Sequence, residues 1–278
     1  MAVVLGLLVA LCYGAGDFLG GVATRAQPVA TVVLVSQGTG LGLVTVILVL
    51  DGTGPPAGGD LALGVLSGLI GVVGVALLYQ GLAAGSMGVV APVTAVGAAL
   101  VPLVAGLVIG ERPSVLALIG AAGALIAIVL VARTPGRHEG SAAKHELVLA
   151  LGAGTAFGFV FVVLGATDEA SGFWPLLGAR AASVTLLLVW VVRSGLPLVP
   201  RRDTRATVMG AGVLDVGANA LYLLAVREGL LSLVSVLSSL YPLTTVLLAR
   251  VVLGERLHRS QVIGLGLGLG GVALIATA

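Results

Sequence analysis

The feature that most restricts the fold of this chain is a succession of long apolar stretches, separated by short connections that hold most of the charge. An α-helix needs about 20 mainly apolar residues to cross the hydrocarbon core of a bilayer. Ten stretches meet this requirement, and they cover residues 3–23, 29–50, 61–83, 87–109, 115–132, 147–166, 173–192, 208–226, 230–252 and 257–276. We therefore predict ten transmembrane helices.

The composition excludes a soluble domain. Hydrophobic residues make up 58% of the 278 residues and charged residues 9%, whereas a soluble domain carries about 25% charged residues. The stretches are apolar on all sides, which suits lipid rather than a half-exposed helix. We predict an all-α integral membrane protein.

No cofactor, metal or nucleic acid is expected as a partner. The three histidines, His138, His145 and His258, fall in predicted loops or at helix ends, and neither a paired-cysteine pattern nor a phosphate-binding Gly-rich loop occurs. The net charge is only +2, and the basic residues lie in connections between spans, as topology determinants do. The expected partners are the lipid bilayer, a small-molecule substrate and protons, and both a monomer and a homodimer remain open.

The two halves of the sequence resemble each other. Gly110-Glu111-Arg112 recurs as Gly254-Glu255-Arg256, an offset of 255 − 111 = 144. A connection rich in proline, glycine and charge divides the chain, so we expect a first five-helix repeat over residues 1–134, a connecting loop over 135–146 and a second repeat over 147–278. Because five is odd, the second repeat must enter the membrane from the opposite side, which is an inverted repeat.

These motifs, together with Tyr13-Gly-Ala-Gly-Asp-Phe-Leu-Gly20 and Tyr241-Pro242-Leu243-Thr244, resemble those of EamA-type members of the drug/metabolite transporter superfamily. The resemblance covers essentially the whole chain. It implies ten helices in two inverted repeats, a central cavity, and transport of metabolites or drugs by alternating access. The first half departs from the pattern, since Ala98 stands where the repeat offset would place proline and Pro102 follows four residues later; we expect the break in the fourth span to be displaced.

The basic residues also predict an orientation in the membrane. Two of them, Arg112 and Arg227, fall on one side of the predicted topology. The other side carries ten: Arg25, Arg133, Arg137, Lys144, Arg193, Arg201, Arg202, Arg205, Arg256 and Arg259. The positive-inside rule then places both termini outside the cytoplasm, although the family usually has its N-terminus inside.

Three ionisable residues lie deep within the predicted spans: Asp17, Arg180 and Asp215. Each costs about 2.5–3.5 kcal/mol at a helix centre on insertion scales, so each should face a cavity or a partner. Asn219 and Tyr222 follow Asp215 at i+4 and i+7, on the same helix face. Arg180 could bind a substrate carboxylate or phosphate, or it could pair with one of the two acids.

We predict that a substrate-binding cavity is lined by Asp17, Gln37, Tyr79, Gln80, Arg180, Asp215, Asn219, Tyr222 and Tyr241. The cluster of Ser235, Ser238 and Ser239 beside Tyr241 is also expected to face it. Aromatic residues make up only 4% of the chain, which favours a hydrogen-bonded site over an aromatic cage. Glu111 and Glu255 are interpreted as hinge or capping residues at the membrane interface.

The predicted function is secondary transport, with efflux favoured, of a small metabolite such as an amino acid, or of an amphipathic drug, across a bacterial-type inner (plasma) membrane. Burial disfavours the charged form of a carboxyl group, so Asp17 or Asp215 could cycle a proton. Two alternatives remain. Gly14-Ala-Gly16-Asp17 contains the Gly-x-Gly-Asp motif of intramembrane aspartyl proteases, which would need two carboxylates sharing one water, and a non-transporting membrane scaffold would seal its polar groups against one another.

Overall fold

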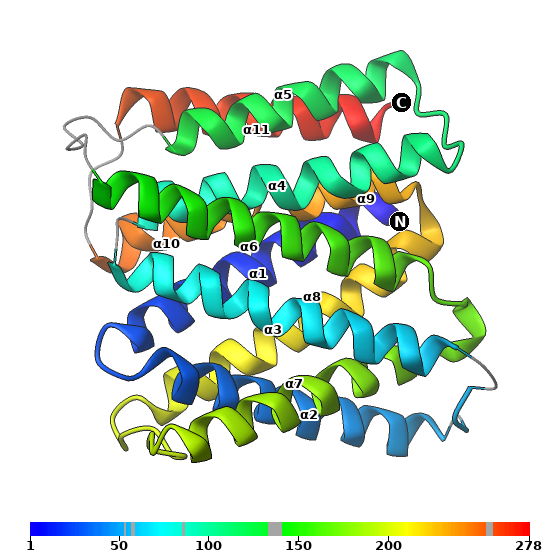
Figure 1. Ribbon diagram of the computed structural model, residues 1–278. Helices are drawn as coiled ribbons and strands as arrows, with labels where there is room; N and C mark the ends of the chain where they lie inside the picture. The colour runs from blue at the N-terminus through cyan, green and yellow to red at the C-terminus, as the bar shows by residue number, and fades with distance from the viewer. Residues whose placement is uncertain (53, 57–58, 85–86, 133–140, 254–257) are drawn as a thin grey trace.

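The computed structural model describes residues 1–52, 54–56, 59–84, 87–132, 141–253 and 258–278, and within these ranges it is helical with no strand. The α-helices are α1 (Ala2–Thr24), α2 (Val29–Asp51), α3 (Asp60–Ala84), α4 (Met87–Val108), α5 (Val115–Ala132), α6 (Ser141–Gly165), α7 (Trp174–Arg193), α8 (Arg205–Glu228), α9 (Leu231–Ser238), α10 (Tyr241–Leu253) and α11 (Arg259–Ala276). A short 3₁₀ helix, η1 (Glu169–Ser171), precedes α7. The helices lie side by side in one bundle (Figure 1).

The lengths and compositions of these helices agree with the predicted spans. Nine stretches in the described part of the chain are long and apolar enough to cross a membrane, counting α9 and α10 together as Leu231–Val252. The tenth predicted span is α5, whose apolar part, Val115–Leu130, is shorter. The prediction of an all-α protein with ten transmembrane helices is confirmed.

The ninth predicted span is not one continuous helix. It divides into α9 and α10 at Ser239 and Leu240. Pro242, the second residue of α10, has no N–H to donate to the carbonyl of Ser238 four residues earlier, so the helical ladder loses a bond there. The carbonyl of Leu237 accepts instead from the N–H of Leu240 at 3.1 Å, which tightens the last turn of α9.

The expected break in the fourth span is absent. Helix α4 continues through both Pro92 and Pro102, so the prediction of a displaced break at Pro102 is wrong. A reason lies in the packing of α4 against α6, where Gly97 of α4 faces Gly154 of α6. A Cβ on Gly154 would lie 2.4 Å from the carbonyl oxygen of Thr94, so the two backbones are in direct contact and α6 supports α4 between its prolines.

The pairing of helices follows an approximate twofold relation between the halves. Helix α6 packs on α3 and α4, while its counterpart α1 packs on α8 and on α9 and α10; α2 pairs with α7, and α5 with α11. Figure 1 shows that α1 starts at the end of the bundle where both termini lie, whereas α6 starts at the opposite end. The two halves of the chain therefore begin to cross the bundle in opposite directions, which is what an inverted repeat requires.

Candidate functional site

A cavity lies between the two halves, near the middle of the bundle. About 70 Å³ of it is open to the centre of a water molecule, and one water needs about 10–15 Å³, so several waters or a small solute fit. Eight helices contribute to its lining, namely α1, α2, α3, α4, α6, α7, α8 and α10. The polar lining residues are Tyr13, Asp17, Ser36, Gln37, Ser67, Tyr79, Arg180, Ser183, Asp215, Asn219 and Tyr241.

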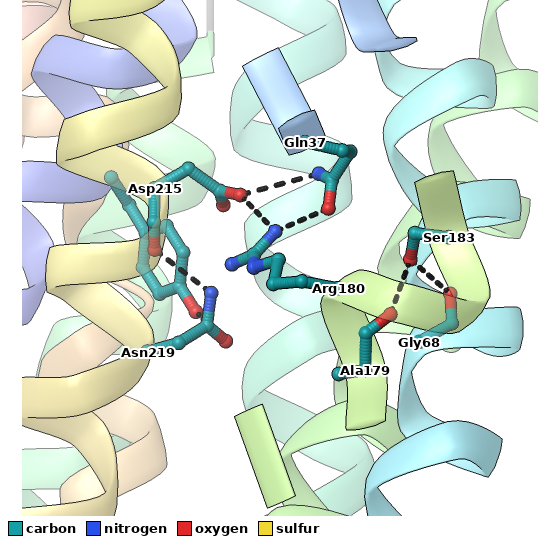
Figure 2. A network of polar contacts seen from close by, with 8 residues as sticks. Gln37, Gly68, Ala179, Arg180, Ser183, Asp215 and Asn219 are labelled. Atoms are coloured by element: carbon teal, nitrogen blue, oxygen red, sulfur yellow. Dashed lines mark hydrogen bonds and ion pairs between the residues drawn. The ribbon is translucent and has the colours of Figure 1, made fainter. Parts of the chain in front are cut away.

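An ion pair joins α7 and α8 at this cavity. Nη1 of Arg180 lies 2.6 Å from Oδ2 of Asp215, and it also donates to Oε1 of Gln37 on α2 (Figure 2). The side-chain amide of Gln37 donates in turn to Oδ2 of Asp215 at 3.3 Å. The side chain of Arg180 is 7% exposed and that of Asp215 is 21% exposed. A charge this deeply buried needs a partner of opposite charge. Arg180 and Asp215 are that partner for each other.

Two further contacts hold this network in place. Asn219 donates from Nδ2 to the backbone carbonyl of Asp215 at 2.8 Å and accepts at Oδ1 from the hydroxyl of Tyr13 at 3.0 Å. Ser183, one turn after Arg180, donates to the carbonyls of Gly68 and Ala179, both at 2.9 Å (Figure 2). These contacts fix α1 to α8 and α7 to α3 around the ion pair.

Asp17 is in a different situation from Asp215. It lines the cavity, yet among the residues that the structure describes it has neither a hydrogen bond nor an ion pair. Three residues further along α1, Gly20 leaves space for Tyr79 of α3, because a Cβ at that position would lie 2.0 Å from the tyrosine hydroxyl oxygen. Within the described part of the chain, the carboxyl group of Asp17 therefore has no compensating partner, and Tyr79 packs against the same helix three residues further on.

Aromatic side chains gather at the cavity despite their scarcity in the chain. Five of the 11 aromatic residues line it: Tyr13, Tyr79, Phe157, Phe161 and Tyr241. The ring of Tyr13 lies 6.0 Å from that of Phe161 and 6.4 Å from that of Tyr241, between centroids. The preference for a hydrogen-bonded site over an aromatic cage stays a prediction, because composition reports how many rings exist but not where the fold places them.

Seven of the nine residues predicted to bind substrate are brought together around the cavity: Asp17, Gln37, Tyr79, Arg180, Asp215, Asn219 and Tyr241. Gln80 is exposed and does not line it, since consecutive residues point about 100° apart on a helix. Tyr222 is fully buried away from the lining, where its hydroxyl donates to the carbonyl of Phe161 at 3.1 Å and contacts Ser235. It shares a face with Asp215, but seven residues place it about 10 Å further along the helix.

Several lining residues were not among those predicted. Tyr13 could have been found, because it precedes Asp17 by four residues and therefore shares its helix face. Phe157 and Phe161 on α6 lie among many other apolar residues, and no sequence signal separates them. In the opposite sense, Ser235, Ser238 and Ser239 were expected at the cavity, but they are fully buried elsewhere in the bundle.

Glu111 links the two halves outside the cavity. Its two carboxylate oxygens accept from the first two backbone N–H groups of α9, that of Leu231 at 2.6 Å and that of Ser232 at 3.0 Å. The first N–H groups of a helix have no partner within it, and they attract negative charge. Glu111, in the first half of the chain, therefore caps α9 in the second half. Its counterpart Glu255 lies outside the described residues.

Comparisons with known proteins agree with this architecture. The family model described as "EamA-like transporter family" matches residues 1–133 and 145–277. A solved structure titled "Crystal structure of protein" superposes with a TM-score of 0.81 at 17% sequence identity, covering 99% of this chain and 98% of the other. No curated protein gives a significant match.

Proposed function

Because the chain belongs to the EamA-like transporter family, we propose that it exports a small metabolite such as an amino acid, or an amphipathic drug, by alternating access in exchange for protons. Its location would be the inner (plasma) membrane. We further propose that the repeats extend over residues 1–134 and 147–278, with 135–146 as their connection. The observation that carries the proposal is the cavity between the halves, because all three ionisable residues of the span interiors line it.

The arrangement of helices supports alternating access. Eight helices from both halves surround the cavity, whereas α5 and α11 pair with each other and do not contribute to its lining. A solute bound at an interface between two inverted units can be released to either side when the units tilt relative to each other. The ion pair between Arg180 and Asp215 joins α7 to α8, so its rearrangement could accompany that movement.

The two alternative functions fit the site less well. An aspartyl protease needs two carboxylates that activate one water, but Asp215 is engaged by Arg180 and Gln37. A scaffold without transport activity should satisfy its buried polar groups internally, since nothing else would stabilise them. Asp17 does not meet this condition within the described part of the chain.

The test is transport by the purified protein in proteoliposomes with an imposed pH gradient. Radiolabelled amino acids and the fluorescent amphipathic dye ethidium serve as solutes. We expect at least one of them to move against its gradient when protons flow the other way, and we expect Arg180→Ala to abolish this. Thr185→Ala is the matched control, because Thr185 is on the same helix but is exposed, and its hydroxyl donates to the carbonyl of Ala181 one turn earlier. Failure of every solute to move, with or without a gradient, would exclude transport of these classes.

A further inference from the structure

The charges of the cavity indicate which class of solute it accepts, given the transport function proposed above. We propose that the cavity binds a monovalent organic cation, a protonated amine or quaternary ammonium with an apolar body, whose charged group lies beside Asp17. A free carboxylate or phosphate anion is then a poor ligand. Three separate features of the site favour such a cation: its net charge, the pairing of Arg180 and the surroundings of Asp17.

The first feature is the net charge of the lining. Its charged side chains are Asp17, Arg180 and Asp215. Arg180 and Asp215 are in contact at 2.6 Å and cancel each other, so the ionised cavity carries one net negative charge, which belongs to Asp17. In a site with little water, one uncompensated negative charge favours a positive solute over a zwitterion or an anion, because the interaction between charges is strong at low dielectric.

The second feature is that the charge of Arg180 is already paired with that of Asp215. Its Nη1 already serves two acceptors, Asp215 and Gln37. Its Nε has no partner among the described residues, but it is buried and lies 3.4 Å from where a Cβ of Gly40 would stand. A solute carboxylate approaching this guanidinium would also meet the negative charge of Asp215, which disfavours an anion here.

The third feature is the surroundings of Asp17. Tyr13 shares its helix face, Tyr79 lies against the next turn of α1, and the ring of Tyr241 is next to that of Tyr13. Cations are attracted both to carboxylates and to the faces of aromatic rings. The remaining wall includes Phe157, Phe161, Leu164 and Leu176, which suits an apolar body attached to the cationic group.

A proton and the solute then compete for the same carboxyl group. The other titratable groups around the cavity are Tyr13, Tyr79, Arg180, Asp215 and Tyr241, and none of the tyrosines supplies a positive charge. With no solute bound, Asp17 takes up a proton; when one cation binds, one proton leaves. Binding of the cation should therefore weaken as the pH falls, and the same exchange would couple export to inward flow of protons.

Four probes that share a phenyl body test the proposal by calorimetry on the purified protein in detergent. They are trimethyl(phenethyl)ammonium as the permanent cation, phenylalanine as the zwitterion, 3-phenylpropionate as the anion and 2-phenylethanol as the neutral compound. We expect the cation to bind at least tenfold more tightly than the other three, with release of about one proton per cation, as shown by the buffer dependence of the heat. Lowering the pH should weaken its binding.

Variants locate the charge responsible. Asp17→Asn should lose at least tenfold in cation affinity and release no proton, Asp17→Glu should retain binding, and Thr185→Ala should match the unaltered protein. Preferred binding of phenylalanine or phenylpropionate, or a cation affinity that ignores both pH and Asp17→Asn, would overturn the cation proposal while leaving transport intact. Should Asp17→Asn fail to fold, the pH dependence and proton release of the unaltered protein still decide. Absence of transport in proteoliposomes would instead refute the proposed function.

Discussion

Arg180→Met alone should destabilise the protein more than the double variant Arg180→Met with Asp215→Asn. Methionine retains much of the length of arginine but leaves the charge of Asp215 without its partner. Breaking a buried ion pair costs about 3–5 kcal/mol when both groups are fully buried. Asp215 is 21% exposed toward the cavity, where water can partly solvate it, so we expect a smaller cost of about 2–4 kcal/mol.

Thermal unfolding in detergent, followed by the fluorescence of the two tryptophans, measures this cost. A loss of that size should lower Tm by about 5–10 °C for a chain of this length. The double variant Arg180→Met with Asp215→Asn has no unpaired charge, so it should recover at least half of the loss. Asp215→Asn alone completes the set. If its effect and that of Arg180→Met simply add in the double variant, the two side chains are not coupled, and the ion pair does not stabilise the protein.

Three further predictions concern other parts of the molecule. Glu111→Ala should cost about 1–2 kcal/mol, the usual range for a lost helix cap, and should lower Tm, whereas an unchanged Tm would show that the cap of α9 is dispensable. Gly20→Ala should displace Tyr79, because the added Cβ would lie 2.0 Å from its hydroxyl oxygen; transport and Tm should fall. If the clash is the cause, adding Gly20→Ala to a Tyr79→Ala chain should lower Tm no further than Tyr79→Ala alone. Alkaline phosphatase fused to the C-terminus should be active, because the distribution of basic residues predicts that this terminus lies outside the cytoplasm. Fluorescence from a reporter that folds only in the cytoplasm, fused at the same position, would show that the predicted orientation is wrong.

The spans could be predicted from the sequence because lipid imposes one simple requirement, a long apolar helix with its backbone bonded internally. The same requirement hides which face of a helix is turned inward. Tyr79 and Gln80 are adjacent on α3, and with apolar residues all round that helix no periodicity shows that the first lines the cavity and the second is exposed. Asn219, by contrast, was found through its spacing from Asp215.

The ionisable residues were identified as important because they are costly in a membrane, but their pairing could not be predicted. Arg180 had two possible acidic partners, and only the relative positions of α1, α7 and α8 show that it contacts Asp215 rather than Asp17. Glu111 was interpreted as a hinge or capping residue, but the helix that it caps could not be predicted, because that helix begins 120 residues later in the chain. Such contacts depend on tertiary packing, which a local pattern does not record.

The contact between Glu111 and α9 also bears on how the protein is made. During synthesis the first half of the chain is translated before the second. The carboxylate of Glu111 is therefore present before α9, whose first N–H groups it accepts from, has been made. The second half of the chain thus completes this contact with a group that the first half already supplies. A gene fragment that encodes only the second half would therefore produce a chain without the Glu111 carboxylate that caps α9.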